Sequence, residues 1–180
     1  MATKSSETKT LEDLLEHGLK DMYYAENKIV KSLEKMVKAA EDEDLKAALE
    51  EHRGETEGQI ATLEKAFEAL GKKAQGEKCD AMDGILKEGD QLLADFKGSP
   101  AGDAAIIFSA QAVEHYEIAR YGSLRNYAEL LGEDEVAEMM QQILDQEGAA
   151  DEKLTDLADG GINDAAAEGM EEDDEEDDGA

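Results

Sequence analysis

A few ionisable residues stand at positions where an amphipathic helix should carry an aliphatic side chain. They are Glu26, His52, Glu55, Glu114, Glu117 and Glu147, with Asp151 close to the last of them. In a chain with 47 acidic residues among 180, a glutamate by itself carries little information. A glutamate on a core face does, because burying an ionised carboxylate is costly unless it is paired, protonated or bound to a metal ion. We therefore take these seven residues as candidate metal ligands.

Four long helices must position these residues, because apolar side chains recur at steps of three and four along four segments. The predicted helices cover residues 10–40, 45–70, 101–131 and 133–158. Gly71, Gly132 and the pair Gly160-Gly161 are placed to end three of them, since glycine often caps a helix C-terminus. A shorter amphipathic helix is expected at residues 82–96.

This order of elements predicts an all-α protein, a four-helix bundle with the short helix in the crossover between the second and third long helices. We expect a flexible N-terminus at residues 1–9, the bundle at residues 10–160 and an acidic disordered tail at residues 161–180. The short helix either covers the bundle or forms a dimer interface.

The candidate glutamates fall near the middle of their helices, so they come to one level of the bundle whichever way the helices run. Glu26, Glu55, Glu114 and Glu147 agree in level to about 6 Å, at ~1.5 Å of rise per residue. Carboxylates that converge in a core repel one another and favour protonation. Two divalent cations would remove the repulsion, and an oxygen-rich site suits iron or manganese.

The other reactive side chains leave alternatives open. His52 precedes Glu55 by three residues and lies on the same helix face, so it either binds metal or orients Glu55. Tyr121 is either a core residue or a hydrogen-bond partner of a ligand. Cys79, the single cysteine, excludes an intrachain disulfide and fits a reducing compartment.

The charge of the chain excludes some partners. The formal net charge is −29, which disfavours nucleic acid and anionic membranes. Part of this charge comes from the acidic run at residues 171–178, and the remaining excess is typical of halophilic proteins. The N-terminal residues lack the apolar stretch of a secretory signal, and no apolar run approaches the ~20 residues of a membrane span. We expect a soluble, cytoplasmic protein.

At the candidate ligands the chain resembles the YciF-type family of stress-associated, ferritin-like proteins. The resemblance covers about residues 10–160, and its matching stretches are residues 21–28, 51–56, 78–82, 111–119 and 147–151. It implies a ferritin-like up-down-down-up bundle, a non-haem di-metal site of the rubrerythrin kind, and a homodimer. It also implies glutamate ligands at Glu26, Glu55, Glu114, Glu117 and Glu147.

The sequence departs from better-known ferritin-like enzymes, because Gly58 and Ala150 stand where their Glu-x-x-His pairs have histidine. His52 and Asp151 are placed to compensate. Our leading hypothesis is a di-metal protein of stress protection that reacts with peroxide or oxygen, or buffers metal, with electrons from an external donor. The alternative is a helical interaction or structural protein whose site is only structural. Metal storage is a third possibility, and it predicts uptake of more than two ions per chain.

Overall fold

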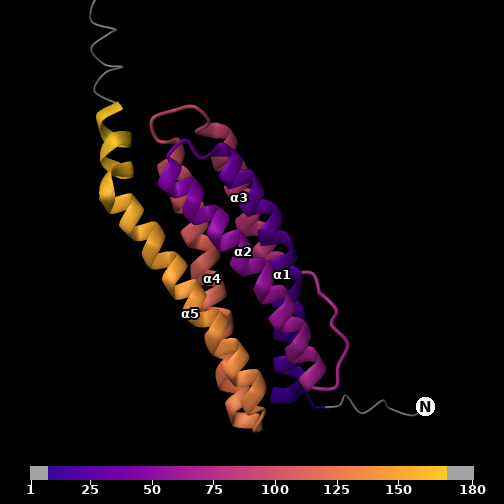
Figure 1. The fold of residues 1–180 in the computed structure, drawn as a ribbon. Coiled ribbons are helices and arrows are strands. Elements are labelled where there is room, and N and C mark those ends of the chain that lie inside the picture. Colours follow the sequence, from indigo (N-terminus) through magenta and orange to yellow (C-terminus); the bar gives the residue numbers. More distant parts are fainter. Residues whose placement is uncertain (1–7, 170–180) are drawn as a thin grey trace, which may run out of the picture.

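The computed structural model describes residues 8–169, and this part of the chain is helical throughout its ordered elements (Figure 1). Its α-helices are α1 (Leu11–Ala39), α2 (Glu43–Ala69), α3 (Asp80–Asp95), α4 (Gly102–Leu131) and α5 (Asp134–Leu157). A π-helical segment, η1 (Ala158–Ile162), follows α5 directly. The predicted all-α class is confirmed, and so is the short helix between the second and third long helices, which is α3.

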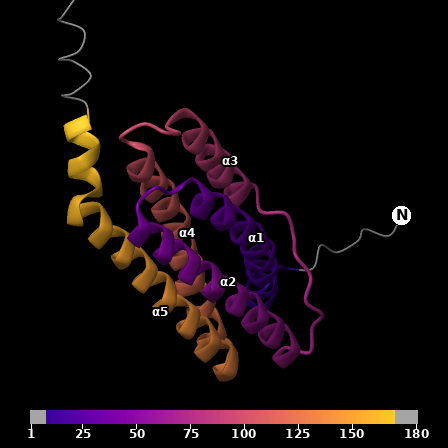
Figure 2. The same cartoon turned by 45° about the horizontal axis from the view of Figure 1, so that its top comes forward.

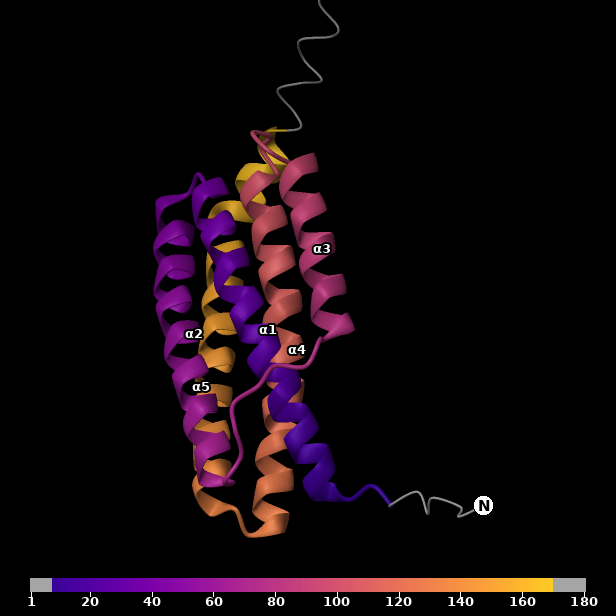
Figure 3. The ribbon, with the colours of Figure 1, turned by 90° about the vertical axis from the view of Figure 1, so that its right-hand side faces the viewer.

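The four long helices form a ferritin-like bundle of two antiparallel hairpins, α1 with α2 and α4 with α5 (Figures 1 and 2). The hairpins pack so that α1 lies against α4 and α2 against α5. From the side, α1 and α5 run upwards while α2 and α4 run downwards (Figure 3). Helix α3 packs on α4 and α1, so it covers one side of the bundle.

Local sequence explains where the helices begin and end. At the start of α1, the Thr10 hydroxyl accepts a hydrogen bond from the Asp13 backbone, and the Asp13 carboxylate accepts one from the Thr10 backbone. The Asp42 carboxylate caps α2 by accepting a bond from the Leu45 backbone N–H. Helix α4 ends at Gly132, which adopts the left-handed conformation with φ of 78°.

The core consists of aliphatic layers along the predicted stripes of α1 and α4. Leu15, Met22, Ile29 and Leu33 are buried on α1, as their spacing predicted. Helices α1 and α4 approach closely at Gly18, where an added Cβ would lie 2.5 Å from Leu124 Cδ2. The apolar layers lie on both sides of a central polar layer, which holds the candidate site.

The C-terminal part of the bundle differs from the prediction. The pair Gly160-Gly161 does not end the helical region: η1 carries the chain through a kink at Gly161, with φ of 136°, and residues 163–169 are again helical. A glycine can adopt this φ, so the chain bends and resumes its helix. Residues 161–169 are therefore not part of a disordered tail, while the acidic run at 171–178 and residues 1–7 lie outside the described residues.

None of the helices that the structure describes is long and apolar enough to span a membrane.

Candidate metal centre

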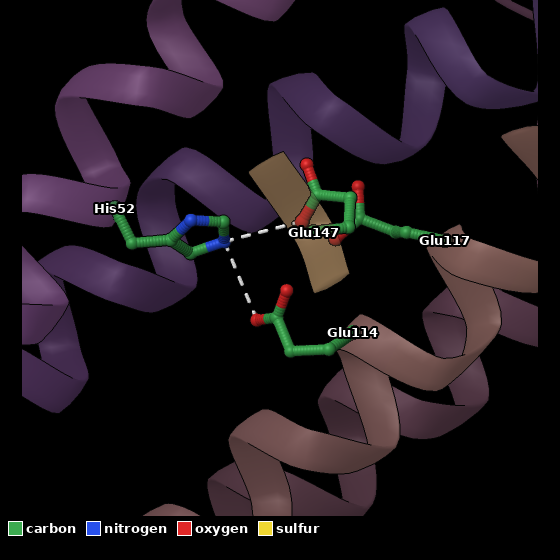
Figure 4. Close-up of side chains that lie close together, drawn as sticks. All are labelled: His52, Glu114, Glu117 and Glu147. Carbon is green, nitrogen blue, oxygen red and sulfur yellow. Dashed lines mark ion pairs between the residues drawn. The ribbon is translucent and has the colours of Figure 1, made fainter. Parts of the chain in front are cut away.

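Four buried side chains from three helices converge in the middle of the bundle (Figure 4). His52 comes from α2, Glu114 and Glu117 from α4, and Glu147 from α5. Each offers one nitrogen or oxygen atom, and these atoms all lie within 4.8 Å of one another. Three carboxylates and one imidazole at this spacing can bind a metal ion together.

Glu26 adds a fourth buried carboxylate, from α1. Its side chain has no exposed surface, and one of its oxygens accepts a hydrogen bond from the buried Tyr121 hydroxyl of α4. This contact answers one question that the sequence left open, because Tyr121 is both a core residue and a hydrogen-bond partner of a candidate ligand. We call Glu26, His52, Glu114, Glu117 and Glu147 the central cluster.

His52 links the central cluster to a sixth residue. Its Nε2 faces inward, 3.3 Å from Glu114 Oε1 and 3.6 Å from Glu147 Oε2. Its Nδ1 faces outward, 3.3 Å from Glu55 Oε2. A carboxylate on the outer ring nitrogen commonly fixes the orientation of a metal-binding histidine. The geometry therefore has Glu55 orienting His52, the reverse of the arrangement considered from the sequence.

The polar atoms of the central cluster are incompletely paired. Among the described residues, the buried atoms without a hydrogen-bond partner include Glu26 Oε2, His52 Nε2, Glu114 Oε2, Glu147 Oε2 and both carboxylate oxygens of Glu117. Folded proteins rarely leave buried polar atoms unpaired, because each costs its full desolvation free energy. Unpaired oxygens and a nitrogen that point at one another are the donor set that a metal ion would satisfy.

The electrostatics of the cluster favour neutralisation. Burial raises the pKa of Glu26 to about 7, although the Tyr121 hydrogen bond opposes the rise. Burial, together with the charges of Glu26, Glu147 and Glu114, holds the pKa of Glu117 well above its usual range. Burial and the neighbouring Glu114 also raise the pKa of Glu147. Burial lowers the pKa of His52, but the Glu114 and Glu55 carboxylates outweigh it and raise the pKa to about 9.

Two sequence-predicted ligands lie outside the central cluster. Glu55 was expected on the buried face of α2, but its side chain is 38% exposed and Thr56 is buried in its place. Residues 52, 55 and 59 recur at helical spacing, and so do residues 52, 56 and 59. The packing of the bundle buries the second set. Asp151 is partly exposed and pairs with His115 Nε2 at 3.2 Å and with the Gln111 amide, so the structure does not bring it to the centre.

One supporting residue was missed as part of the site. Gln59 is buried on α2, and its amide donates a hydrogen bond to Glu147 Oε1. The signal was available in the sequence, because a glutamine on a core face needs a polar partner. The sequence does not identify that partner, because Glu147 is 88 residues away in the chain.

A second polar cluster lies on the side of α4 that faces α1 and α3. The Tyr116 hydroxyl donates a hydrogen bond to Asp21 Oδ2 at 2.7 Å and lies 3.0 Å from Cys79 Sγ. Cys79 is buried and caps the start of α3, where its sulfur accepts a bond from the Met82 backbone. Burial and the Asp21 hydrogen bond raise the pKa of Tyr116 above its usual range. This Asp21–Tyr116–Cys79 network joins three helices.

Comparison with known proteins identifies the family. Residues 10–167 match the family described as "Domain of unknown function (DUF892)". The chain is 40% identical over 156 residues to Protein YciF of Escherichia coli K12, covering 86% of this chain and 94% of YciF. The chain therefore belongs to the DUF892 family and is a relative of YciF.

Solved structures agree with this assignment. The crystal structure of the E. coli stress protein YciF matches with a TM-score of 0.82 and 39% identity, over 87% of this chain and 99% of that one. YcfI of Rhodopseudomonas palustris, named as a candidate structural protein, matches with a TM-score of 0.81 and 46% identity, over 85% and 98% of the two chains. The fold and the family resemblance predicted from the sequence are confirmed.

Proposed function

We propose that this member of the DUF892 family binds two divalent metal ions, iron or manganese, in the central cluster and serves in protection against stress. The observation that carries the proposal is the set of unpaired oxygens on fully buried carboxylates. Glu26, Glu114, Glu117 and Glu147 bring four negative charges when ionised, and two divalent ions bring four positive charges. His52, when neutral, adds a nitrogen ligand without changing this balance.

The donor set supports iron or manganese over softer metals. Carboxylate oxygens with one imidazole suit these fairly hard cations, whereas zinc and copper sites favour more nitrogen and sulfur. Cys79 does not compete, since its thiol belongs to the Asp21–Tyr116–Cys79 network. When bound, a pair of iron or manganese ions would supply electrons and Lewis acidity toward peroxide or oxygen.

The protein's own residues would hold the site in a defined geometry. The Tyr121 hydroxyl fixes one oxygen of Glu26 and leaves the other free, and the Gln59 amide does the same for Glu147. The Glu55 carboxylate orients the His52 ring. One ligand on each of α1, α2 and α5 therefore receives a restraint from a neighbouring side chain, which keeps it directed at the centre.

The role in stress protection rests on similarity. The E. coli relative is described as a stress protein, and we extend this role to the present chain. Since the described residues contain a single group of metal-binding type, we expect reducing electrons to come from a separate donor.

We further propose that the protein is a cytoplasmic homodimer, with the 67%-exposed Phe108 of α4 available for contact with a second copy. Light scattering should then show a dimer that Phe108→Asp weakens.

Metal analysis of protein purified without chelator tests the main proposal. We expect about two iron or manganese ions per chain, as in carboxylate di-metal sites. Glu114→Ala should lower this occupancy while the helical circular dichroism stays unchanged. Glu138→Ala is a matched control, because Glu138 is an exposed glutamate of α5. Equal metal content in wild type and Glu114→Ala would contradict the assignment.

A structural role without metal is the second candidate. It is favoured by the raised pKa values of Glu117 and Glu147, which allow neutral carboxyl groups to remain in the core, and by the description given to YcfI. In that case the purified protein should contain no metal, and a chelator should leave its thermal stability unchanged. Rapid peroxide consumption by metal-loaded protein would support the first proposal, and uptake of many more than two ions would point to storage.

A further inference from the structure

A cavity of about 260 Å³ between α2 and α5 connects the surface of the bundle with the central cluster. Its inner end is formed by His52 and Glu114, and the acids Glu51 and Glu55 line it nearer to the solvent, together with the exposed Lys153. Aliphatic side chains such as Leu49 and Ala150 make up much of the remaining wall. At roughly 30 Å³ per water molecule, the cavity has room for a small hydrated ion.

The central cluster needs such an opening, because its side chains are almost fully buried. Glu26, Glu114, Glu117 and Glu147 are each at most 1% exposed, and His52 is 6% exposed. Glu114 is therefore more than nine-tenths buried, yet it lines the cavity and its Oε2 has no partner among the described residues. An unpaired carboxylate oxygen at the inner end of a cavity indicates a cation as the species that travels through it.

The outer acids supply negative charge where the cavity meets the solvent. Glu51 is exposed, and Glu55 follows it by four residues, so the two carboxylates lie one helical turn apart on one face of α2. Glu55 is half-exposed, with one oxygen on His52 Nδ1. The two acids outweigh the single Lys153 on the lining, and a net negative charge at an opening in low-dielectric walls concentrates cations there and raises their association rate.

Ala150 keeps the cavity open. It is the residue three positions after Glu147, where the better-known ferritin-like enzymes have a histidine. Its methyl group lines the cavity, and a larger side chain at this position would fill it. The small side chain at position 150 thus leaves a passage beside Glu114.

From these observations we infer that the cavity between α2 and α5 is the route by which divalent metal ions reach the central cluster, with Glu51 attracting the ion and Glu55 passing it to Glu114. The inference rests on the proposed function, and it adds the direction and the residues of metal loading. Loading by this route requires no redox step, because the ion only exchanges bound water molecules for carboxylate oxygen ligands.

The rate of Co²⁺ uptake by chelator-treated full-length protein, followed by the visible absorption of bound Co²⁺, tests the route. Glu51→Lys should slow loading about tenfold or more at low salt, because it replaces an attracting charge at the opening by a repelling one. The number of ions bound at equilibrium should stay that of the wild type. Glu57→Lys is the matched control, since Glu57 is exposed on α2 away from the cavity and changes the net charge equally.

A second pair of variants tests the passage by size. Ala150→Phe should slow loading in the same way, whereas Ala112→Phe on the exposed face of α4 should not. At ~1 M salt, where the screening length falls to about 3 Å, the effect of Glu51→Lys should shrink and that of Ala150→Phe should persist. Normal Co²⁺ stoichiometry with wild-type rates in both cavity variants would overturn the route alone. A wild-type protein that takes up no Co²⁺ would overturn the proposed function as well.

Discussion

Helix α4 carries two polar clusters on adjacent residues, and they differ in how well their atoms are paired. Tyr116 belongs to the Asp21–Tyr116–Cys79 network, where its hydroxyl contacts a carboxylate and a thiol. Glu117 belongs to the central cluster, and neither of its oxygens has a partner within the described residues. A paired network stabilises the packing of helices by itself, whereas an unpaired one depends on a ligand or on protonation. The contrast makes the central cluster the candidate for a ligand-binding site.

The largest expected difference between the clusters is the response to metal. Mn²⁺ at about a thousandfold excess over its Kd should raise the free energy of unfolding by about 4 kcal/mol per ion, because it binds only the folded chain. Urea denaturation with metal or with chelator measures this increment. Glu114→Ala should lose most of it, and Tyr116→Phe should retain it. An increment of equal size in both variants would show that metal binds elsewhere.

The response to pH should separate the clusters next. The pKa of Glu26 rises from 4.5 to about 7 in the fold, so the metal-free protein should lose stability as the pH rises through this interval, by about 3 kcal/mol at 1.36 kcal/mol per pKa unit. The pKa of His52 rises from 6.5 to about 9, so its contribution is complete below pH 6.5 and is lost by pH 9. Both shifts predict decreasing stability between pH 4.5 and 9.

Urea denaturation in chelator at several pH values measures this loss. Glu26→Gln should make the curve shallower between pH 4.5 and 7, since the neutral amide does not titrate, while Glu117 and Glu147 keep the rest of the slope because their pKa values are also raised. Bound metal should weaken the dependence as well, because a metal ion stabilises the ionised carboxylates. A metal-free wild type that gains stability over this range would contradict the assignment of unpaired acids to the core.

Removing one buried acid should have a smaller effect of unusual sign. Glu117→Leu should raise the free energy of unfolding in chelator by about 2 kcal/mol, because well-packed apolar residues often replace buried charges with a gain in stability. The same variant should bind less metal. Glu138→Leu, at an exposed position of α5, should stay within about 0.5 kcal/mol of the wild type. Destabilisation by Glu117→Leu would mean that this carboxylate has a partner.

Breaking the paired network should have the smallest effect. Tyr116→Phe removes a hydrogen bond to the Asp21 carboxylate and should destabilise the protein by about 1 kcal/mol in urea denaturation. Metal content should not change, since Tyr116 points away from the central cluster toward α1 and α3. Loss of metal in this variant would show that the Asp21–Tyr116–Cys79 network also contributes to metal binding.

The helical stripes of α1 and α4 could be predicted because each is marked by strongly apolar neighbours. Glu26 lies between Met22 and Ile29, and Glu114 follows Ala110 by four residues, so no other register buries the aliphatic side chains. Helix α2 is more polar near its centre, and the steps through Glu55 and Thr56 fit equally well. The packing of the bundle buries Thr56 and leaves Glu55, one of the predicted ligands, half-exposed.

The amino-acid sequence by itself determined the helices, their order in the bundle and the level at which the acids meet, because helical periodicity and end signals are local properties of the chain. Only the tertiary structure decided which side chains share hydrogen bonds, which atoms stay unpaired and where a cavity opens. Tyr121 and Glu26, like Gln59 and Glu147, are far apart in the chain and meet through the packing of helix pairs. Such contacts depend on the rotation of each helix about its axis, which is set by the whole core at once.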